Sequence, residues 1–285
     1  MTPRQRFRQY LEGDAIGYPV SVFDPVSARL ARHLGAELGI LGGSIASAVV
    51  LGAPDLIVLT LSELADQVRR IMRAADVSLL VDADHGYGNA LNAMRTVEEL
   101  EAADASALTL EDTSLPAAFG DSSPRIITAD EMVGKLRAAV SARRDPSLVV
   151  IARTSAPATL STDEVCRRVA AYSETGVDGI MLIGVTRREQ LEAVRSVSNL
   201  PLVMGSYTPE LADEEFLRAN GVRIVVRGHQ PFFVAMKSLH DAMKHLTEGG
   251  PPEALSDAVA SQALQNAVLN AEEYQAWQRD FLGRG

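Results

Sequence analysis

The sequence contains a single cysteine, no run of basic residues and no long hydrophobic segment. Because Cys166 is the only cysteine, no disulfide can form within the chain. The longest stretch without a charged residue, Leu38–Pro54, is broken by Gly42 and Gly43 and falls short of a membrane span. Met1–Tyr10 carries three arginines with no apolar block after them, unlike a signal peptide. We therefore expect a cytoplasmic protein that does not enter the membrane.

Positive charge is scarce relative to negative charge. The chain has 27 Lys and Arg residues against 37 Asp and Glu residues, a formal net charge of −10 at pH 7. Such a surface repels nucleic acids and anionic membranes, so we expect neither as a partner. Hydrophobic residues, by contrast, are plentiful: they make up 47% of 285 residues, enough for one large α/β barrel or two smaller domains.

Eight short apolar runs recur along the chain, and amphipathic stretches with helical spacing separate them. The runs are Val20–Phe23, Leu38–Leu41, Leu79–Ala83, Ala107–Leu110, Leu148–Ala152, Gly179–Ile183, Leu202–Met204 and Arg223–Val226. They are rich in Val, Ile and Leu with little alternation, as strands buried on both faces of a parallel sheet are. This pattern predicts an α/β fold, a (β/α)₈ TIM barrel. A doubly wound open sheet is the alternative, but polar, Gly-rich clusters follow almost every run and favour the barrel.

The pattern changes after residue 248. Gly249–Pro252 reads Gly-Gly-Pro-Pro, a linker sequence, and the helical stretch Leu255–Leu282 follows with three aromatic residues on one face. We therefore expect a catalytic barrel over residues 1–248 and a linker with a helical tail over residues 249–285. The aromatic face packs either on its own barrel or on a neighbouring subunit, and the residues alone leave both open.

The segment after the third run is the most informative, because chemistry in such barrels lies at the carboxyl ends of the strands. It reads Asp82-Ala83-Asp84-His85-Gly86-Tyr87-Gly88-Asn89. Alternation along a strand sends Asp82 and Asp84 to the same side, where two carboxylates repel each other unless a cation lies between them. Hard oxygen ligands suit Mg²⁺, and Mn²⁺ would also fit. The alternative is that one aspartate caps the next helix and the other is solvated.

Further charged residues follow the neighbouring runs. Glu111 ends the fourth run, and Asp55 lies beyond the second; we expect both to bind the same metal ion, through water, beside Asp82 and Asp84. Arg153 ends the fifth run, where its forked guanidinium can neutralise the acidic site or bind a substrate carboxylate. For Glu111 and Arg153, a salt bridge that serves only stability is the alternative.

Smaller polar residues complete the candidate site. Gly43 and Ser44 follow the second run, where backbone N–H groups and a hydroxyl can hold a carboxylate or an enolate oxygen; an ordinary turn is the alternative. Tyr207 follows the seventh run and His229 the eighth. We expect His229 to orient a substrate carboxylate or to donate a proton, with Tyr207 as the other candidate donor. A lone histidine is, however, commonly structural.

Together these segments resemble the isocitrate lyase / phosphoenolpyruvate mutase superfamily, from about Val20 to His229. The resemblance rests on SVFDPVSARLA (Ser21–Ala31), LGGS (Leu41–Ser44), DADHGYGNA (Asp82–Ala90), LEDT (Leu110–Thr113) and ART (Ala152–Thr154). It implies a (β/α)₈ barrel whose last helix is exchanged between the subunits of a homo-oligomer, a dimer or a tetramer. An exchanged helix favours an intermolecular position for the tail.

The loop after the fourth run indicates the branch. Lyases and mutases of the superfamily carry a Lys-Lys-Cys-Gly-type motif there, whereas Leu115–Ser123 has neither lysine nor cysteine. With the strings DADHGYGNALN and VVRGH, this loop is most similar to the bacterial oxaloacetate decarboxylase branch. That resemblance implies that Ser44, Arg153 and His229 bind substrate and that Asp82 binds Mg²⁺. Arg227 stands where an uncharged amide is expected, which puts the choice of 2-oxo acid in doubt.

These features predict a Mg²⁺-dependent carboxy-lyase that acts on a small 2-oxo dicarboxylate, oxaloacetate. Loss of CO₂ would leave the pyruvate enolate, whose negative charge the metal ion stabilises. Two alternatives stay open. The chain is another Mg²⁺-dependent 2-oxo acid lyase or hydrolase of the superfamily, acting on oxaloacetate or phosphonopyruvate, or it is a non-catalytic metabolite-binding relative that has kept the metal site.

Overall fold

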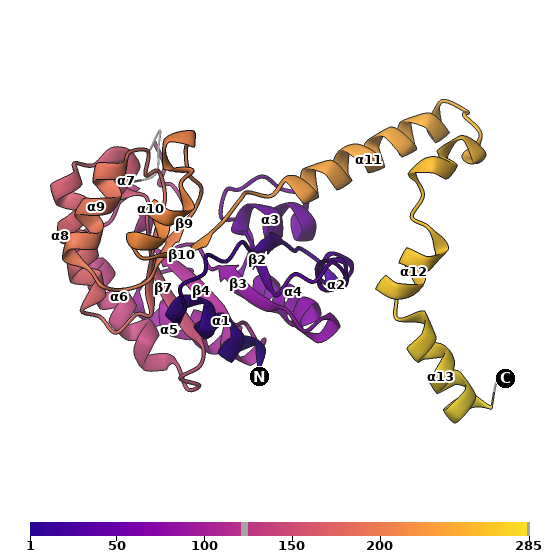
Figure 1. The fold of residues 1–285 in the computed structure, drawn as a ribbon, viewed down its shortest axis with the longest axis horizontal. Helices are drawn as coiled ribbons and strands as arrows, with labels where there is room; N and C mark the ends of the chain where they lie inside the picture. Colours follow the sequence, from indigo (N-terminus) through magenta and orange to yellow (C-terminus); the bar gives the residue numbers. More distant parts are fainter. Residues whose placement is uncertain (121–124, 284–285) are drawn as a thin grey trace.

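The computed structural model describes residues 1–120 and 125–283. Its centre is an eight-stranded parallel sheet with the strand order β1-β2-β3-β4-β7-β8-β9-β10 (Figure 1). A parallel bridge between Gly17 and Ile224 joins the two ends of the sheet, and the N–H groups of Gly17 and Val225 donate to the carbonyls of Arg223 and Gly17. The sheet therefore curls round on itself, which confirms the predicted (β/α)₈ architecture over the doubly wound alternative.

All eight predicted runs form strands of this sheet. They are β1 (Val20–Ser21), β2 (Leu38–Leu41), β3 (Ser78–Asp82), β4 (Ala107–Glu111), β7 (Val149–Thr154), β8 (Gly179–Leu182), β9 (Leu202–Met204) and β10 (Val222–Val225). A two-stranded hairpin that the sequence did not predict, β5 (Thr113–Ser114) with β6 (Arg125–Ile126), follows β4. Of the loop 115–123, residues 121–123 lie outside the described residues.

Helices α2, α4, α5, α6, α8 and α10 around the barrel begin at residues whose side chains cap the helix. In α4, the Thr60 hydroxyl accepts from the Glu63 N–H while the Glu63 side chain accepts from the Thr60 N–H, which satisfies two backbone donors that a helix start leaves free. The helices of this layer are α2 (Pro25–His33), α3 (Gly43–Leu51), α4 (Leu61–Ala74), α5 (Ala90–Ala102), α6 (Ala129–Ala142), α7 (Ala156–Thr159), α8 (Thr162–Ser173), α9 (Arg188–Val197), the 3₁₀ turn η1 (Pro209–Leu211) and α10 (Glu214–Ala219). The amphipathic stretches that separate the predicted strands are thereby confirmed as helices, among them α4, α5, α6 and α8.

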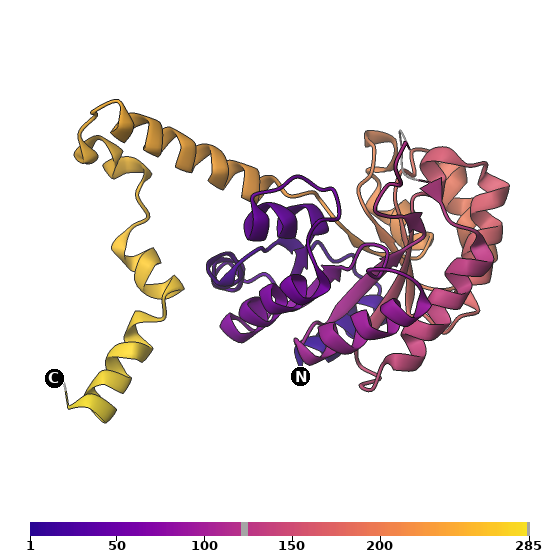
Figure 2. The same cartoon turned by 180° about the vertical axis from the view of Figure 1, so that it is seen from behind.

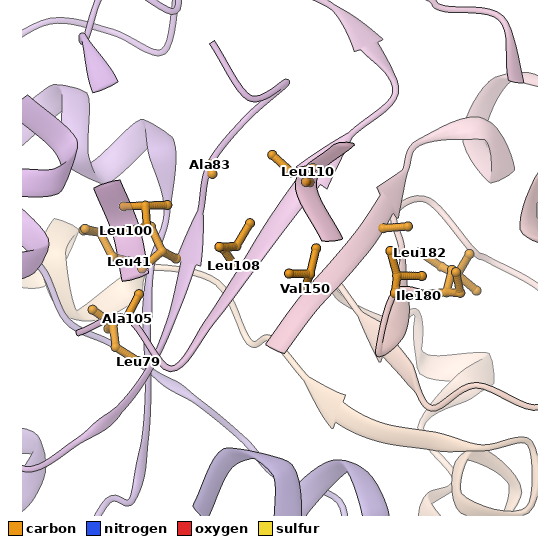
Figure 3. Packing of buried hydrophobic residues seen from close by; sticks show 14 of the residues in the cluster. Leu41, Leu79, Ala83, Leu100, Ala105, Leu108, Leu110, Val150, Ile180 and Leu182 are labelled. Carbon is orange, nitrogen blue, oxygen red and sulfur yellow. The ribbon is translucent and has the colours of Figure 1, made fainter. Parts of the chain in front are cut away.

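Buried side chains form two clusters, one on each face of the barrel wall. Outward-facing residues such as Leu108, Leu110 and Val150 pack beneath the helices (Figure 3). Inward-facing residues such as Ala107 and Val149 fill the barrel. Because side chains alternate along a strand, this pattern fixes which residues point inward at the carboxyl end of each strand.

The amino-terminal helix α1 (Pro3–Glu12) closes the other end of the barrel. Phe7 and Leu11 are buried against the inward-facing cluster. The three arginines of this helix reach groups at the amino ends of the strands: Arg4, Arg6 and Arg8 pair with Asp145, Asp76 and Asp178. Arg4 and Arg8 also donate to backbone carbonyls, among them those of Ala105 and Ser147. Interior access is therefore confined to the carboxyl end.

The chain leaves the barrel after His229. Helix α11 (Gln230–Thr247) projects away from the sheet (Figure 1) and contains no buried residue. Its exposed apolar side chains are Phe233, Val234, Met236, Leu239, Met243 and Leu246, each between 45% and 64% exposed. An apolar helix without a covered face is incomplete as a monomer. The predicted division at residue 248 stays a prediction.

The tail is helical but broken into three pieces: η2 (Pro252–Ala258), α12 (Gln262–Val268) and α13 (Ala271–Leu282). Figure 2 shows it hanging beside the barrel. Only α12 returns to the body, where the Arg29 guanidinium donates to the Val268 carbonyl at 3.2 Å. Tyr274, Trp277 and Phe281 of α13 are between 43% and 77% exposed, so packing of these aromatic residues on their own barrel is not observed. No helix among the described residues is long and apolar enough to cross a membrane.

Candidate active site

A cavity of about 980 Å³ opens at the carboxyl ends of the strands. Its lining includes Asp55, Asp82, Asp84, Glu111, Thr113, Arg153, Ser155 and Arg168 among polar residues, and Leu56, Ile57, Leu115, Pro116, Ala117, Ile126 and Leu160 among apolar ones. Four carboxylates thus share the lining with two arginines, and the apolar residues come mainly from the loops. The sequence-predicted acids and Arg153 are therefore brought to one place.

Strand alternation delivers three of these side chains to the barrel interior. Asp82 and Glu111 are the last residues of β3 and β4, and Arg153 is the residue before the end of β7. Glu111 pairs in register with Arg153, and Asp82 pairs with Thr109. Ala107 on β4 faces inward. Because every second side chain of a strand points to the same face, Glu111 on the same strand faces inward as well.

Arg153 contacts two of the carboxylates. Its Nη1 donates to Asp82 Oδ1 at 2.6 Å, and its Nε lies 3.1 Å from Glu111 Oε2. Burial is the largest influence on the pKa of Asp82 and raises it, but the charge of Arg153 and its hydrogen bond outweigh burial, so that pKa lies below its ordinary value. Burial raises the pKa of Glu111 to about 7 although Arg153 opposes the rise. Thr109 also donates to Asp82 Oδ1 at 3.2 Å.

Asp84 reaches the cavity by a different route from the predicted strand alternation. Strand β3 ends at Asp82, and Asp84 has a φ of +48° in the left-handed region, which aspartate tolerates better than most residues. Its carbonyl accepts from the Glu111 N–H at 2.8 Å. Burial, followed by repulsion from Asp82, Glu111 and Asp55, raises the pKa of Asp84 to about 8.

The start of α3 lies against this acidic group. A Cβ added at Gly43 would lie 2.8 Å from Asp84 Oδ1, and one at Gly42 would lie 2.4 Å from His229 Nε2. Only glycine allows the backbone to approach both side chains this closely. Ser44 is the second residue of α3 and is half-buried. The carboxyl ends of β2, β3 and β10 therefore meet at one point.

His229 follows the end of β10, as expected from its place after the eighth run, and it contacts a residue that the sequence did not single out. Its Nδ1 lies 2.8 Å from the hydroxyl of Ser21 on β1. Burial lowers the pKa of His229, with Asp82 opposing the shift, so the ring is neutral at pH 7. Ser21 begins the SVFDP string that contributes to the family resemblance, and this is the only signal for it in the sequence.

Three other residues lie elsewhere. Tyr207 packs against the outward-facing cluster and is not part of the cavity lining. Arg227 stacks on Tyr18, with 3.6 Å from its Cζ to the ring centroid, also away from the lining. His85 is buried, and its carbonyl accepts from Lys135 Nζ; burial and that ammonium lower the pKa of His85 to about 4.

Asp55, by contrast, does line the cavity, and burial and Asp82 raise its pKa.

The donor set suits a divalent cation held partly through water. Among residues 1–120 and 125–283, no three His, Cys, Asp or Glu side chains converge closely enough to enclose an ion by themselves. Yet the buried or half-buried Asp82, Asp84 and Glu111 and the exposed Asp55 face one cavity, and the pKa of Asp84 is raised by burial and then by the charges of the other three. A hard divalent cation relieves this repulsion, and Mg²⁺ keeps several water ligands when it binds to one or two carboxylates.

The metal-free protein is expected to lose stability as the pH rises from about 4 to about 8. The ordinary pKa values of Asp84 and Glu111 are 3.8 and 4.5, whereas in the fold they are about 8 and about 7. In this window the folded state binds more protons than the unfolded state, so raising the pH favours unfolding. Urea titrations in EDTA measure the free energy of unfolding at each pH, and Asp84→Asn should flatten the slope. A wild-type stability that rises over the same window would contradict this assignment.

Comparison with known proteins places this geometry in context. Residues 7–247 match the family model of phosphoenolpyruvate phosphomutase. An oxaloacetate decarboxylase of Bradyrhizobium diazoefficiens is 48% identical over 98% of this chain and 97% of its own length. An oxaloacetate decarboxylase of Rhodopseudomonas palustris is 46% identical over 98% and 97%. The structure of a phosphonopyruvate hydrolase in complex with oxalate and Mg²⁺ superposes with a TM-score of 0.85 at 27% identity and covers 99% of this chain and 100% of that one.

Proposed function

Because the chain belongs to the phosphoenolpyruvate phosphomutase family, we propose that it decarboxylates oxaloacetate to pyruvate and CO₂ with the help of a divalent cation, Mg²⁺ or Mn²⁺. The observation that carries the proposal is the inward convergence of Asp82, Asp84, Glu111 and Arg153 on one cavity. The identity to two oxaloacetate decarboxylases, 48% and 46% over nearly the full length, supports this substrate over phosphonopyruvate.

Asp82 would hold the cation directly, with Asp84, Glu111 and Asp55 binding its water ligands. When bound, the cation supplies a Lewis acid for negative charge on the substrate's C2 oxygen. This assignment is consistent with the absence of a close three-ligand group among the described side chains, since it asks for one direct carboxylate ligand. It also explains why four acids share a cavity with Arg153.

The chain's own residues bind the substrate and stabilise charge. Arg153 neutralises the dicarboxylate, because its guanidinium already faces the cavity and has five N–H donors. When the C3–C4 bond breaks, CO₂ leaves and the electron pair remains as the pyruvate enolate. The N–H groups of Gly43 and Ser44, at the first turn of α3, have no acceptor within their helix and can donate to that oxyanion.

His229 is the residue that we propose to orient the departing carboxylate or to protonate the enolate carbon. When the Ser21 hydroxyl donates to Nδ1, Nε2 carries the ring proton and can donate a hydrogen bond to the substrate carboxylate. Protonation of the enolate carbon would use the imidazolium form of His229, in which both ring nitrogens carry protons and which becomes the neutral ring after the transfer. Neither Tyr207 nor His229 is among the residues that line the cavity. Tyr207 packs against the outward-facing cluster, whereas His229 lies against Gly42, next to the Gly43 backbone that Asp84 approaches, so the proposal rests on His229. Decarboxylation needs no general base, which agrees with a loop that has no cysteine at positions 115–123.

Product analysis tests the proposed reaction. With oxaloacetate and Mg²⁺ we expect pyruvate and CO₂ in equal amounts, above the spontaneous metal-catalysed loss measured without protein. Oxalate plus acetate would instead identify a hydrolase of oxaloacetate, and inorganic phosphate released from phosphonopyruvate would identify a phosphonopyruvate hydrolase. Binding of oxalate without turnover of either 2-oxo acid would identify a non-catalytic relative.

We also propose that the chain forms a homo-oligomer in which α11 and the tail cover a second copy. The support is the apolar helix α11, which has no buried residue, and the exposed aromatic residues of α13. Light scattering should give at least two chain masses. The double substitution Leu239→Glu and Met243→Glu should yield monomers, whereas the control Ser238→Glu, on the same helix, should not. A monodisperse wild-type monomer would contradict the proposal. Cytoplasmic localisation and the lack of a nucleic-acid or membrane partner stay predictions.

A further inference from the structure

A second group of polar side chains lies directly behind the active-site acids, on the outer face of the barrel wall. Asp112 follows Glu111, and Thr154 follows Arg153. Because side chains alternate along a strand, Asp112 and Thr154 point away from the cavity and towards α8. There they meet Arg168 and Tyr172, and all four side chains are buried. Arg168 also borders the cavity, so it is the member of the group that connects the outer face to the site. We call these four residues the Asp112 cluster.

One carboxylate oxygen of Asp112 gathers most of the hydrogen bonds in the cluster. Asp112 Oδ2 accepts from the Thr154 hydroxyl at 2.8 Å, from the Tyr172 hydroxyl at 2.8 Å and from Arg168 Nη1 at 3.3 Å. Asp112 itself is 0% exposed, and its Oδ1 has no partner among the described residues. A buried, hydrogen-bonded carboxylate adds little net stability compared with apolar side chains of the same volume. Stability alone therefore does not account for Asp112.

The backbone of Asp112 extends these contacts to both neighbouring elements. Its N–H donates to the Arg153 carbonyl at 3.2 Å, and its carbonyl accepts from the Ile127 N–H at 2.8 Å. Arg168 Nη1 also donates to the Ile127 carbonyl at 2.9 Å. The cluster therefore ties the end of β4 to the end of β7 and to the chain that leaves the β5–β6 hairpin.

We propose that the Asp112 cluster is a positioning device for the active site, which sets the relative placement of Glu111 and Arg153. These two side chains are register partners at the ends of β4 and β7, the two strand ends that Asp112 and Thr154 connect from behind. The Glu111–Arg153 contact, at 3.1 Å, leaves Arg153 Nε without a hydrogen-bond partner among the described residues. Its geometry is thus set by the strands rather than by the contact itself. This inference rests on the proposed function of the site.

Tyr172→Phe is the most conservative test, because it removes one hydroxyl and substitutes no cavity-lining residue. Arg168, which donates to that hydroxyl at 3.1 Å, keeps its hydrogen bonds to Glu164 and to the Ile127 carbonyl. We expect about a tenfold lower kcat for oxaloacetate and about a tenfold weaker affinity for Mg²⁺ in the presence of oxalate, as for other supporting residues behind a metal site. Asp112→Asn should have a larger effect in the same direction. Isothermal titration calorimetry with Mg²⁺ and oxalate, and steady-state kinetics, supply the two measurements.

The matched control lies at the opposite end of the same barrel. Asp178 also accepts three hydrogen bonds, from Arg8, from Arg143 and from the Val150 N–H. Asp178→Asn should lower the melting temperature without changing kcat or Mg²⁺ affinity. If Tyr172→Phe behaves like this control, losing stability alone, the proposal is overturned. The calorimetric readout does not need turnover, so an inactive wild-type chain would contradict the proposed reaction and leave this test valid.

Discussion

Replacing Asp82 with asparagine is expected to lower kcat/KM for oxaloacetate by about 10³-fold or more, because a metal ion contributes several kcal/mol to charge stabilisation. Asp82 is the carboxylate whose pKa is held below its ordinary value, through Arg153, so it is ionised and ready to bind a cation at any physiological pH. Asparagine keeps the shape and the acceptor oxygen but removes the charge.

Mg²⁺ titration of the initial rate measures this effect, with oxalate-linked Mg²⁺ affinity as the second readout. Glu99→Gln is a suitable control, since Glu99 pairs with Arg95 on the outer surface of α5 and should have wild-type kinetics. Full activity of Asp82→Asn in EDTA would remove the metal ion from the mechanism. If Asp82→Asn is fully active but still depends on Mg²⁺, another carboxylate must bind the ion directly, and Asp84 would be the first candidate.

The second large effect is expected for Arg153→Met, in stability and in binding at once. Asp82 and Glu111 would be left as buried carboxylates without their cation, and breaking a buried ion pair costs about 3–5 kcal/mol. Oxalate should bind about 100-fold more weakly, because the loss of one partner of a buried charge pair costs at least about 2 kcal/mol. Arg153→Lys keeps the charge but not the forked guanidinium, so its stability and its oxalate affinity should lie between those of the wild type and of Arg153→Met.

Urea denaturation in EDTA and again with Mg²⁺ separates the two roles of Arg153. If repulsion between the carboxylates causes the instability, then Mg²⁺ should restore much of the free energy of unfolding in Arg153→Met. A loss of stability that Mg²⁺ does not reverse would assign Arg153 to the fold alone. An unchanged oxalate affinity would exclude it from substrate binding.

The barrel was predictable because its strands are buried on both faces and therefore appear as continuous apolar runs. The runs at β2 and β9 agree with the observed strands at both ends, and glycines or polar residues follow them. Asp82, Glu111 and Arg153 could be predicted as neighbours for the same reason, since parallel strands end at one edge. Arg153 was expected to face these acids, but its contacts with Asp82 through Nη1 and with Glu111 through Nε could not be predicted, because they depend on the register of the strands.

Other features of the site could not be predicted from sequence patterns. Asp84 was expected on the strand, yet it reaches the cavity through a left-handed turn that a two-residue alternation does not encode. Ser21 and Tyr172 are ordinary-looking residues, and their roles arise from partners 208 and 60 positions away in the chain. The tail was predicted as one helical stretch, but short helices joined by bends replace it, because no body of its own chain packs along its apolar face.

The position of α1 constrains the order in which the molecule assembles. Its arginines contact Asp145 and Asp178, which are 141 and 170 residues further along the chain. During synthesis, α1 must wait until more than half of the polypeptide has emerged before these contacts can form. Contacts of such long sequence separation form late, because closing large loops costs entropy first. Helix α1 is thus synthesised well before the partners that hold it against the amino ends of the strands.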